Sequence, residues 1–159
     1  MLFRSGSGND RILGDYVQRA DIAGHDTLWG GAGNDTLVGD SEWDGGTGND
    51  VLDGGDGNDS LYGSGGTDVL TGGKGNNLLD AGNGNDELST AGTGTFTGGT
   101  GTDTAKLFAT PAADTIVISA TAITVNGVAI PYTSIEDLKI YTMGGADSVT
   151  TSEIGRAHV

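Results

Sequence analysis

Leucines recur along residues 24–92 in short segments that are separated by stretches rich in glycine and polar residues. Within two runs the spacing is nine residues, and the leucines are Leu28, Leu37, Leu52, Leu61, Leu70, Leu79 and Leu88. An Asp or Asn stands two residues before each leucine, and a glycine stands two residues before that. This pattern predicts strands of about three residues joined by turns of about six, and no helix of useful length.

Two such units make one coil of a solenoid, with one strand in each of two parallel sheets. A coil of eighteen residues places every second unit in the same sheet and its Asp at the same edge. The sets expected to stack are Leu52, Leu70 and Leu88; Leu61 and Leu79; Asp50, Asp68 and Asp86; and Asp59 with Asn77.

The register has breaks. After Asp44 the strand part is missing and the next unit starts at once. Residues 13–20 carry no clear unit, although Gly6–Leu13 (GSGNDRIL) is one. The unit Thr90–Thr97 lacks its Asp and one residue, and Gly98–Lys106 restores the pattern with Asp103. We therefore assign 6–110 to the repeat region.

Residues 111–152 differ from the repeats because they are rich in β-branched residues and poor in glycine. Within them, Asn126-Gly127 stands between the apolar stretches ITV and VAI, which is the strongest short-range signal for a hairpin. We expect a separate, small β-strand-rich segment here.

Both ends of the chain are expected to be non-native. The ending IGRAHV and the beginning MLFRS each correspond to a reading frame of a common sequencing adapter. Residues 1–5 and 153–159 are therefore expected not to belong to the native protein, and the native part is expected to be an internal piece of a longer protein.

Charge and composition exclude several classes of binding partner. The chain has 159 residues, 31 of them glycine, no cysteine and a formal net charge of −15. Such a chain repels nucleic acid and anionic membranes, and no apolar run is long enough to cross a bilayer. Composition alone also fits a disordered acidic linker, but a linker has no reason to hold the nine-residue register.

The chemistry of the turns points to a hard cation. Glycines allow carbonyl oxygens to converge, and the Asp adds a carboxylate at the end of each turn. Oxygen donors in a flexible turn, without His or Cys, suit Ca²⁺ better than Mg²⁺. One leucine per nine residues buries too little apolar surface to order the turns. We therefore expect a chain that is unfolded without calcium and folded with it.

The units resemble the G-G-x-G-x-D-x-U-x nonapeptide of RTX (repeats-in-toxin) proteins of the haemolysin type. Gly30–Val38, Gly45–Asp53 and Gly54–Tyr62 match it at every specified position, and Gly72–Asp80 has Asn77 in place of the Asp. The resemblance implies an all-β fold, a right-handed parallel β-roll with several Ca²⁺ ions stacked between its turns. It also implies a secreted, extracellular bacterial protein that is exported unfolded by type I secretion machinery.

The expected metal-site residues follow from this alignment. They are Asp10, Asp26, Asp35, Asp50, Asp59, Asp68 and Asp86, with Gly30, Gly45, Gly54 and Gly63 at the first repeat position and Gly33, Gly48, Gly57 and Gly66 at the fourth. The Asp59/Asn77 site should be the weakest because Asn77 lacks a charge. Asp40, Asp53, Asp56 and Asp80 lie off the ligand position and are expected to be surface charges, and His25 to be an ordinary turn residue.

The sequence predicts no catalysis within this chain. The glycine-rich turns lack the Lys-Ser/Thr of a P-loop and the third glycine of a dinucleotide motif, and the acidic spacing does not fit an EF-hand. No credible Ser/His/Asp constellation exists. An alternative is that the module is the accessory region of a secreted hydrolase (protease or lipase) or of a repeat adhesin whose active part lies elsewhere.

Overall fold

The computed structural model describes residues 2–13, 24–40 and 46–151. Among these residues the regular elements are all strands, and none forms a helix that could span a membrane. The strands form two sheets, and most neighbouring strands are parallel. The prediction of an all-β, parallel β-roll is confirmed.

The first sheet has seven strands, in the order β1-β3-β5-β7-β9-β11-β15. Their bounds are β1 Leu2–Arg4, β3 Thr27–Ala32, β5 Val51–Asp56, β7 Val69–Thr71, β9 Glu87–Thr90, β11 Thr104–Phe108 and β15 Asp137–Tyr141. β1 pairs in parallel with β3, so residues 2–4 of the end treated above as non-native extend this sheet.

The second sheet has nine strands, in the order β16-β12-β13-β14-β10-β8-β6-β4-β2. Their bounds are β2 Arg11–Leu13, β4 Thr36–Val38, β6 Ser60–Gly65, β8 Asn76–Asn83, β10 Thr93–Thr100, β12 Thr115–Ile118, β13 Ala122–Val125, β14 Val128–Thr133 and β16 Ser148–Thr151. Several strands are longer than the three residues expected, because they continue into the glycine-rich positions of the next unit.

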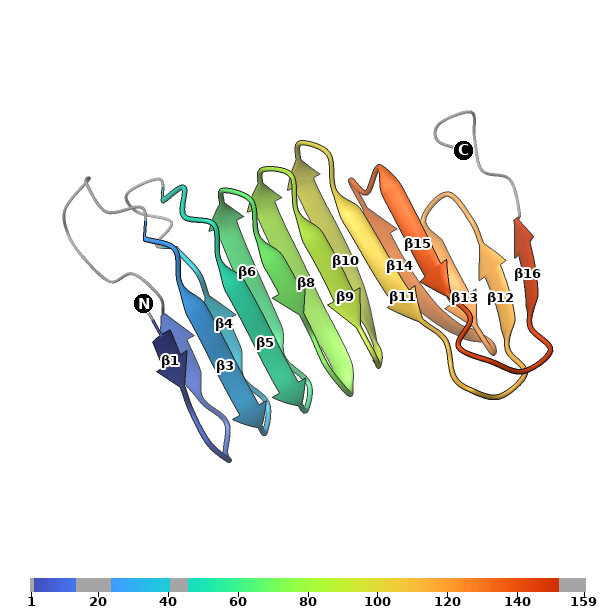
Figure 1. Cartoon of the computed structure of the whole chain (residues 1–159), viewed down its shortest axis with the longest axis horizontal. Helices are drawn as coiled ribbons and strands as arrows, with labels where there is room; N and C mark the ends of the chain where they lie inside the picture. The colour runs from blue at the N-terminus through green and yellow to red at the C-terminus, as the bar shows by residue number, and fades with distance from the viewer. Residues whose placement is uncertain (1, 14–23, 41–45, 152–159) are drawn as a thin grey trace.

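The chain alternates between the sheets from one repeat to the next, so the coils stand side by side along the molecule (Figure 1). Two turn edges result. At edge I the chain passes from the second sheet to the first, for example before β5. At edge II it passes from the first sheet to the second, for example before β6.

The leucines of the repeat fill the space between the sheets. All seven are completely buried, and successive ones are paired across neighbouring strands. In the first sheet Leu52 pairs with Leu70 and Leu70 with Leu88, and in the second sheet Leu61 pairs with Leu79. The eighteen-residue coil and the predicted stacking of the leucines are therefore confirmed.

The imperfect units keep the same core. In the unit that lacks an Asp, Gly94 lies opposite Asn77 and the buried Phe96 lies opposite Leu79. Ala105 takes the place of a leucine beside Leu88. Asp44, after which the sequence predicts a missing strand, lies outside the described residues.

The C-terminal segment continues both sheets. β14 pairs in parallel with β10, and β15 pairs in parallel with β11, so strand pairing joins residues 111–151 to the repeats. β13 and β14 pair antiparallel around Asn126 and Gly127, whose φ angles of 50° and 83° suit a two-residue hairpin turn. β16 then pairs in parallel with β12.

Candidate metal centre

The repeat aspartates form a ladder along each turn edge. The backbone N–H of each one donates to the Oδ1 atom of the residue at the same position in the next coil. On edge I these bonds join Asp26 to Asp50, Asp50 to Asp68, Asp68 to Asp86 and Asp86 to Asp103, at 2.8–2.9 Å. On edge II they join Asp10 to Asp35, Asp35 to Asp59 and Asp59 to Asn77, at 2.8–2.9 Å.

The ladder leaves the second carboxylate oxygen of several aspartates buried and without a partner. Among the described residues this holds for the Oδ2 atoms of Asp35, Asp59, Asp68, Asp86 and Asp103, whose residues are at most 3% exposed. Buried polar atoms in proteins are almost always paired, and a buried charge is costly unless it is compensated. Each of these orphan oxygens therefore needs a hydrogen-bond donor or a positive charge to offset the cost of burying it.

Burial changes the titration of these carboxyl groups. Desolvation raises the pKa of Asp59, Asp86 and Asp103, and it raises the pKa of Asp68 to about 7. Neighbouring carboxylates add to the rise, as Asp50 and Asp86 do for Asp68. Either a proton or a cation at the orphan oxygen would relieve this cost.

Glycine at the first repeat position makes room for the orphan oxygen. A Cβ on Gly63 would overlap both the Oδ2 atom of Asp68 and the carbonyl oxygen of Ala81, which lies one coil further on. A Cβ on Gly30 would overlap Asp35 Oδ2 and the Gly54 carbonyl oxygen in the same way. A carboxylate oxygen and a carbonyl oxygen, both acceptors, therefore face the same glycine.

Glycine at the fourth position has a different structural role. A Cβ on Gly57 would overlap the carbonyl of Gly33, the equivalent residue of the preceding coil, and a Cβ on Gly66 would overlap that of Gly48. These glycines allow successive turns to stack closely. The structure therefore gives them a packing role.

Asn77 shows what the ladder does without a second carboxylate oxygen. Its Oδ1 atom accepts the bond from Asp59, and its Nδ2 atom donates to Thr90 Oγ1 at 3.2 Å and to the Gly73 and Lys74 carbonyls at 3.4 Å each. A Cβ on Gly72 would overlap this Nδ2 atom, as one on Gly63 would overlap Asp68 Oδ2. An N–H donor thus occupies the place of the orphan oxygen.

A second ladder was missed by the sequence reasoning. The Asn at the fifth repeat position accepts, through Oδ1, a bond from the backbone N–H of the next coil. Such bonds join Asn34 to Asn9, Asn58 to Asn34, Thr67 to Asn49, Asn76 to Asn58 and Thr102 to Asn85, each at 2.8 Å. The recurring Gly-Asn-Asp sequence carried this signal.

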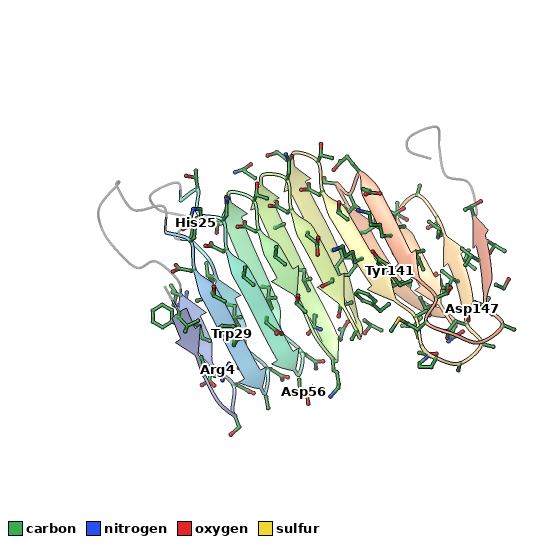
Figure 2. The ribbon with its side chains drawn as sticks, in the orientation of Figure 1. Arg4, His25, Trp29, Asp56, Tyr141 and Asp147 are labelled. Carbon is green, nitrogen blue, oxygen red and sulfur yellow. The ribbon has the colours of Figure 1, made fainter. Side chains whose placement is uncertain are left out.

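His25 stands in the same ladder. Its Nδ1 atom accepts from the backbone N–H of Asn49 at 2.7 Å, so it replaces an Asn. Figure 2 places His25 at one turn edge and Asp56 at the other. The expectation of an ordinary turn residue understated this bond.

The turn between β4 and β5 corrects the expectation for Asp40 and adds Gly39 to the site. Asp40 is 1% exposed and its Oδ2 atom accepts from the Gly48 N–H, so Asp40 is not a surface charge. A Cβ on Gly39 would overlap Asp50 Oδ2, so Gly39 stands beside Asp50 in the first-position place for which Gly45 was predicted. Gly45 itself lies outside the described residues. The inserted residues of this turn hid the relation between Gly39 and Asp50.

The C-terminal segment contains a further rung on edge II. The N–H of Asp114 donates to Asp147 Oδ1 at 2.9 Å. The Asp114 carboxylate is buried but accepts bonds from Thr110 and from Asn126 Nδ2, which hold its pKa below the usual range. Asp147 is labelled in Figure 2, at the same edge as Asp56. This rung is satisfied by its own donors.

The donor set fits a hard cation only if carbonyl oxygens take part. Within the described residues, no group of three or more His, Cys, Asp and Glu side chains is placed to hold a metal. At the Asp35, Asp68 and Asp103 rungs a carboxylate oxygen and a carbonyl oxygen face the same glycine, and both are hard ligands of the type that Ca²⁺ takes. The fit therefore depends on the carboxylate and the turn carbonyls together.

Comparison with known families agrees with this chemistry. The family described as RTX calcium-binding nonapeptide repeat (4 copies) matches residues 23–42, 44–70 and 62–92. No curated protein and no solved structure matches the chain.

Proposed function

We propose that this chain, whose residues 23–42 and 44–92 are RTX calcium-binding nonapeptide repeats, binds several Ca²⁺ ions in its turns and folds as they bind. The proposed ligands are the carboxylates of Asp26, Asp35, Asp50, Asp59, Asp68 and Asp86, with carbonyl oxygens of the first-position residues. Bound calcium supplies positive charge between stacked carboxylates.

One observation carries the proposal. At Asp35, Asp59, Asp68 and Asp86 the Oδ2 atom is buried without a partner, whereas at the equivalent Asn77 an N–H donor fills the same place. The rungs with an orphan carboxylate oxygen thus favour a positive group from outside the chain, and the rung with an amide does not need one. We expect no bound ion at Asn77.

The cellular setting is part of the same proposal. A chain of net charge −15 whose turns need cations stays unfolded where calcium is scarce and folds where calcium is abundant. This supports a secreted protein, exported unfolded by type I machinery, that folds outside the cell. The repeats act there as a structural module, and any protease, lipase or adhesin activity belongs to other parts of the parent protein.

A calcium titration of the whole chain, followed by far-UV circular dichroism with Mg²⁺ as control, tests the proposal. A coil-to-β transition is expected with Ca²⁺ alone, at concentrations on the order of 10⁻⁴–10⁻³ M. The triple variant Asp50→Asn, Asp68→Asn, Asp86→Asn should lose most of the calcium dependence.

A matched triple variant outside the ladder, Asp53→Asn, Asp56→Asn, Asp80→Asn, removes the same number of charges. It should keep the transition of the wild type. Equal loss in both triple variants would show that general charge repulsion, rather than site binding, sets the response. An identical spectrum with calcium and with a chelator would refute calcium-dependent folding.

A further inference from the structure

The last repeat meets the C-terminal segment at edge I, where the nonapeptide pattern has ended. Asp103 belongs to the repeat unit Gly98–Lys106 and is completely buried. Opposite it lies the short connection from β14 to β15, residues 134–136, in place of a six-residue turn. The family match ends at residue 92, so neither side of this junction falls within it.

Three contacts hold the short connection against the repeat. The backbone N–H of Asp103 donates to Glu136 Oε2 at 2.9 Å, so Glu136 continues the ladder of edge I. The N–H groups of Glu136 and Asp137 donate to the Asp103 carbonyl at 3.1 and 2.9 Å. Ser134 has a φ of 51°, in the left-handed region that a serine seldom adopts, so the chain changes direction at this residue.

The turned backbone brings an acceptor to the orphan oxygen of Asp103. A Cβ on Gly98 would overlap both Asp103 Oδ2 and the Ser134 carbonyl oxygen. Asp103 Oδ2 is buried and has no hydrogen-bond partner, and the residue facing it offers another acceptor instead of a donor. The arrangement repeats that of Asp68 Oδ2 and the Ala81 carbonyl, although Ser134 is outside the repeats.

The satisfied aspartate of the same region provides the contrast. Asp114 is as deeply buried as Asp103, but Thr110 and Asn126 donate to its carboxylate. The C-terminal segment therefore satisfies a buried carboxylate with donors at one junction and leaves one facing a carbonyl at the other. Two facing acceptors need a positive group between them.

We propose that Asp103 Oδ2 and the Ser134 carbonyl oxygen bind a divalent cation that ties the C-terminal segment to the roll. This inference rests on the proposed function, because it takes the repeats to be calcium sites. It goes beyond that function in assigning an ion to a site of which half is made by a non-repeat turn. Binding there makes the docking of β15 depend on calcium.

The test is the number of Ca²⁺ ions bound by the full chain, measured by equilibrium dialysis at saturating calcium. Asp103→Asn removes the orphan oxygen but keeps the ladder acceptor, as Asn77 does naturally, and should bind one ion fewer than the wild type. Asp137→Asn, an exposed neighbour that loses the same charge, should bind the wild-type number. Hydrogen exchange of β15 should be slowed by calcium in the wild type and less so in Asp103→Asn.

An unchanged ion count in a folded Asp103→Asn chain would overturn the junction site and leave the repeat sites standing. No calcium binding by the wild type would overturn the proposed function as well. If Asp103→Asn does not fold, crystals of the wild type grown with Ca²⁺ decide the question. Density within about 2.3–2.6 Å of both oxygens supports the site, and ions at the repeats with none here refute it.

Discussion

Restoring the repeat at Asn77 gives the sharpest test of the ladder, because one atom changes from a donor to an acceptor. In Asn77→Asp the Oδ1 bond from Asp59 remains, whereas the three bonds from Nδ2 to Thr90, Gly73 and Lys74 are lost. The new oxygen would be buried, since Asn77 is 2% exposed. The variant thereby acquires the orphan oxygen of its neighbours.

These contacts set the size of the expected change in the free energy of unfolding. Leaving a buried acceptor unsatisfied costs about 1–3 kcal/mol, so the variant should be less stable than the wild type by about that amount where calcium is scarce. One additional ion adds about 1.4 kcal/mol of stability for each tenfold rise in free calcium above its dissociation constant. The two stability curves should therefore cross within about two decades of calcium concentration.

Urea unfolding at a series of free calcium concentrations, all high enough to fold the wild type, measures both quantities. The slope of the unfolding free energy against the logarithm of calcium should be greater in Asn77→Asp by one ion. Asn76→Asp is the control, because Asn76 is the exposed neighbour and undergoes the same chemical change. Equal slopes for Asn77→Asp and the wild type would refute the idea that the Asn77 amide replaces an ion.

Three further perturbations follow from the same contacts. Burial raises the pKa of Asp68 to about 7 in the folded state, so the metal-free roll takes up protons on folding. It should therefore become more stable as the pH falls from 8 towards 4. Circular dichroism in chelator should show β structure increasing over this range, and a steady loss of β structure would contradict the prediction. Gly57→Ala should lower the urea midpoint at saturating calcium more than Gly127→Ala. Both glycines have positive φ, but only a Cβ on Gly57 would overlap a neighbouring carbonyl, that of Gly33. Equal losses would mean that the substitution at Gly57 costs only the conformational strain of about 1–2 kcal/mol and no steric overlap. Leu70→Ala removes a fully buried side chain between Leu52 and Leu88 and should lower the free energy of unfolding by about 2–5 kcal/mol, measured by calorimetry or urea. A loss below about 1 kcal/mol would show that the aspartate ladder rather than the leucine core limits stability.

The stacking of the repeat could be predicted because its period fixes which residues meet. Once eighteen residues make a coil, Leu52 must lie beside Leu70 and Asp50 beside Asp68, whatever the details of the turns. The same period indicated that the unit at Thr90–Thr97 is one residue short, and Gly94 indeed lies opposite Asn77. Periodicity therefore carried the core and the two aspartate ladders.

Features without a period were missed. The pairing of Gly39 with Asp50 spans an insertion, and the junction at Ser134 and Glu136 uses a turn that does not resemble the repeat. The Asn ladder was missed for another reason: polar turn residues have no hydrophobic pattern, and the bond that Asn58 accepts depends on backbone geometry. Hydrogen-bond direction is decided by the fold and cannot be taken from residue type alone.

The direction of the ladder has a consequence for cooperativity. Each aspartate receives its hydrogen bond from the preceding coil, as Asp68 does from Asp50, while its own N–H is fixed by the following coil, here by Asp86. Each aspartate is therefore held by hydrogen bonds from both neighbouring turns. An ion bound at one rung is expected to order the rungs on either side of it. In an array coupled only between neighbours, stability comes from the interfaces as well as from the single repeats. Calcium should then fold the roll over a narrower concentration range than independent sites would allow, and the Asn77 rung, whose amide is held by Thr90, should need no ion.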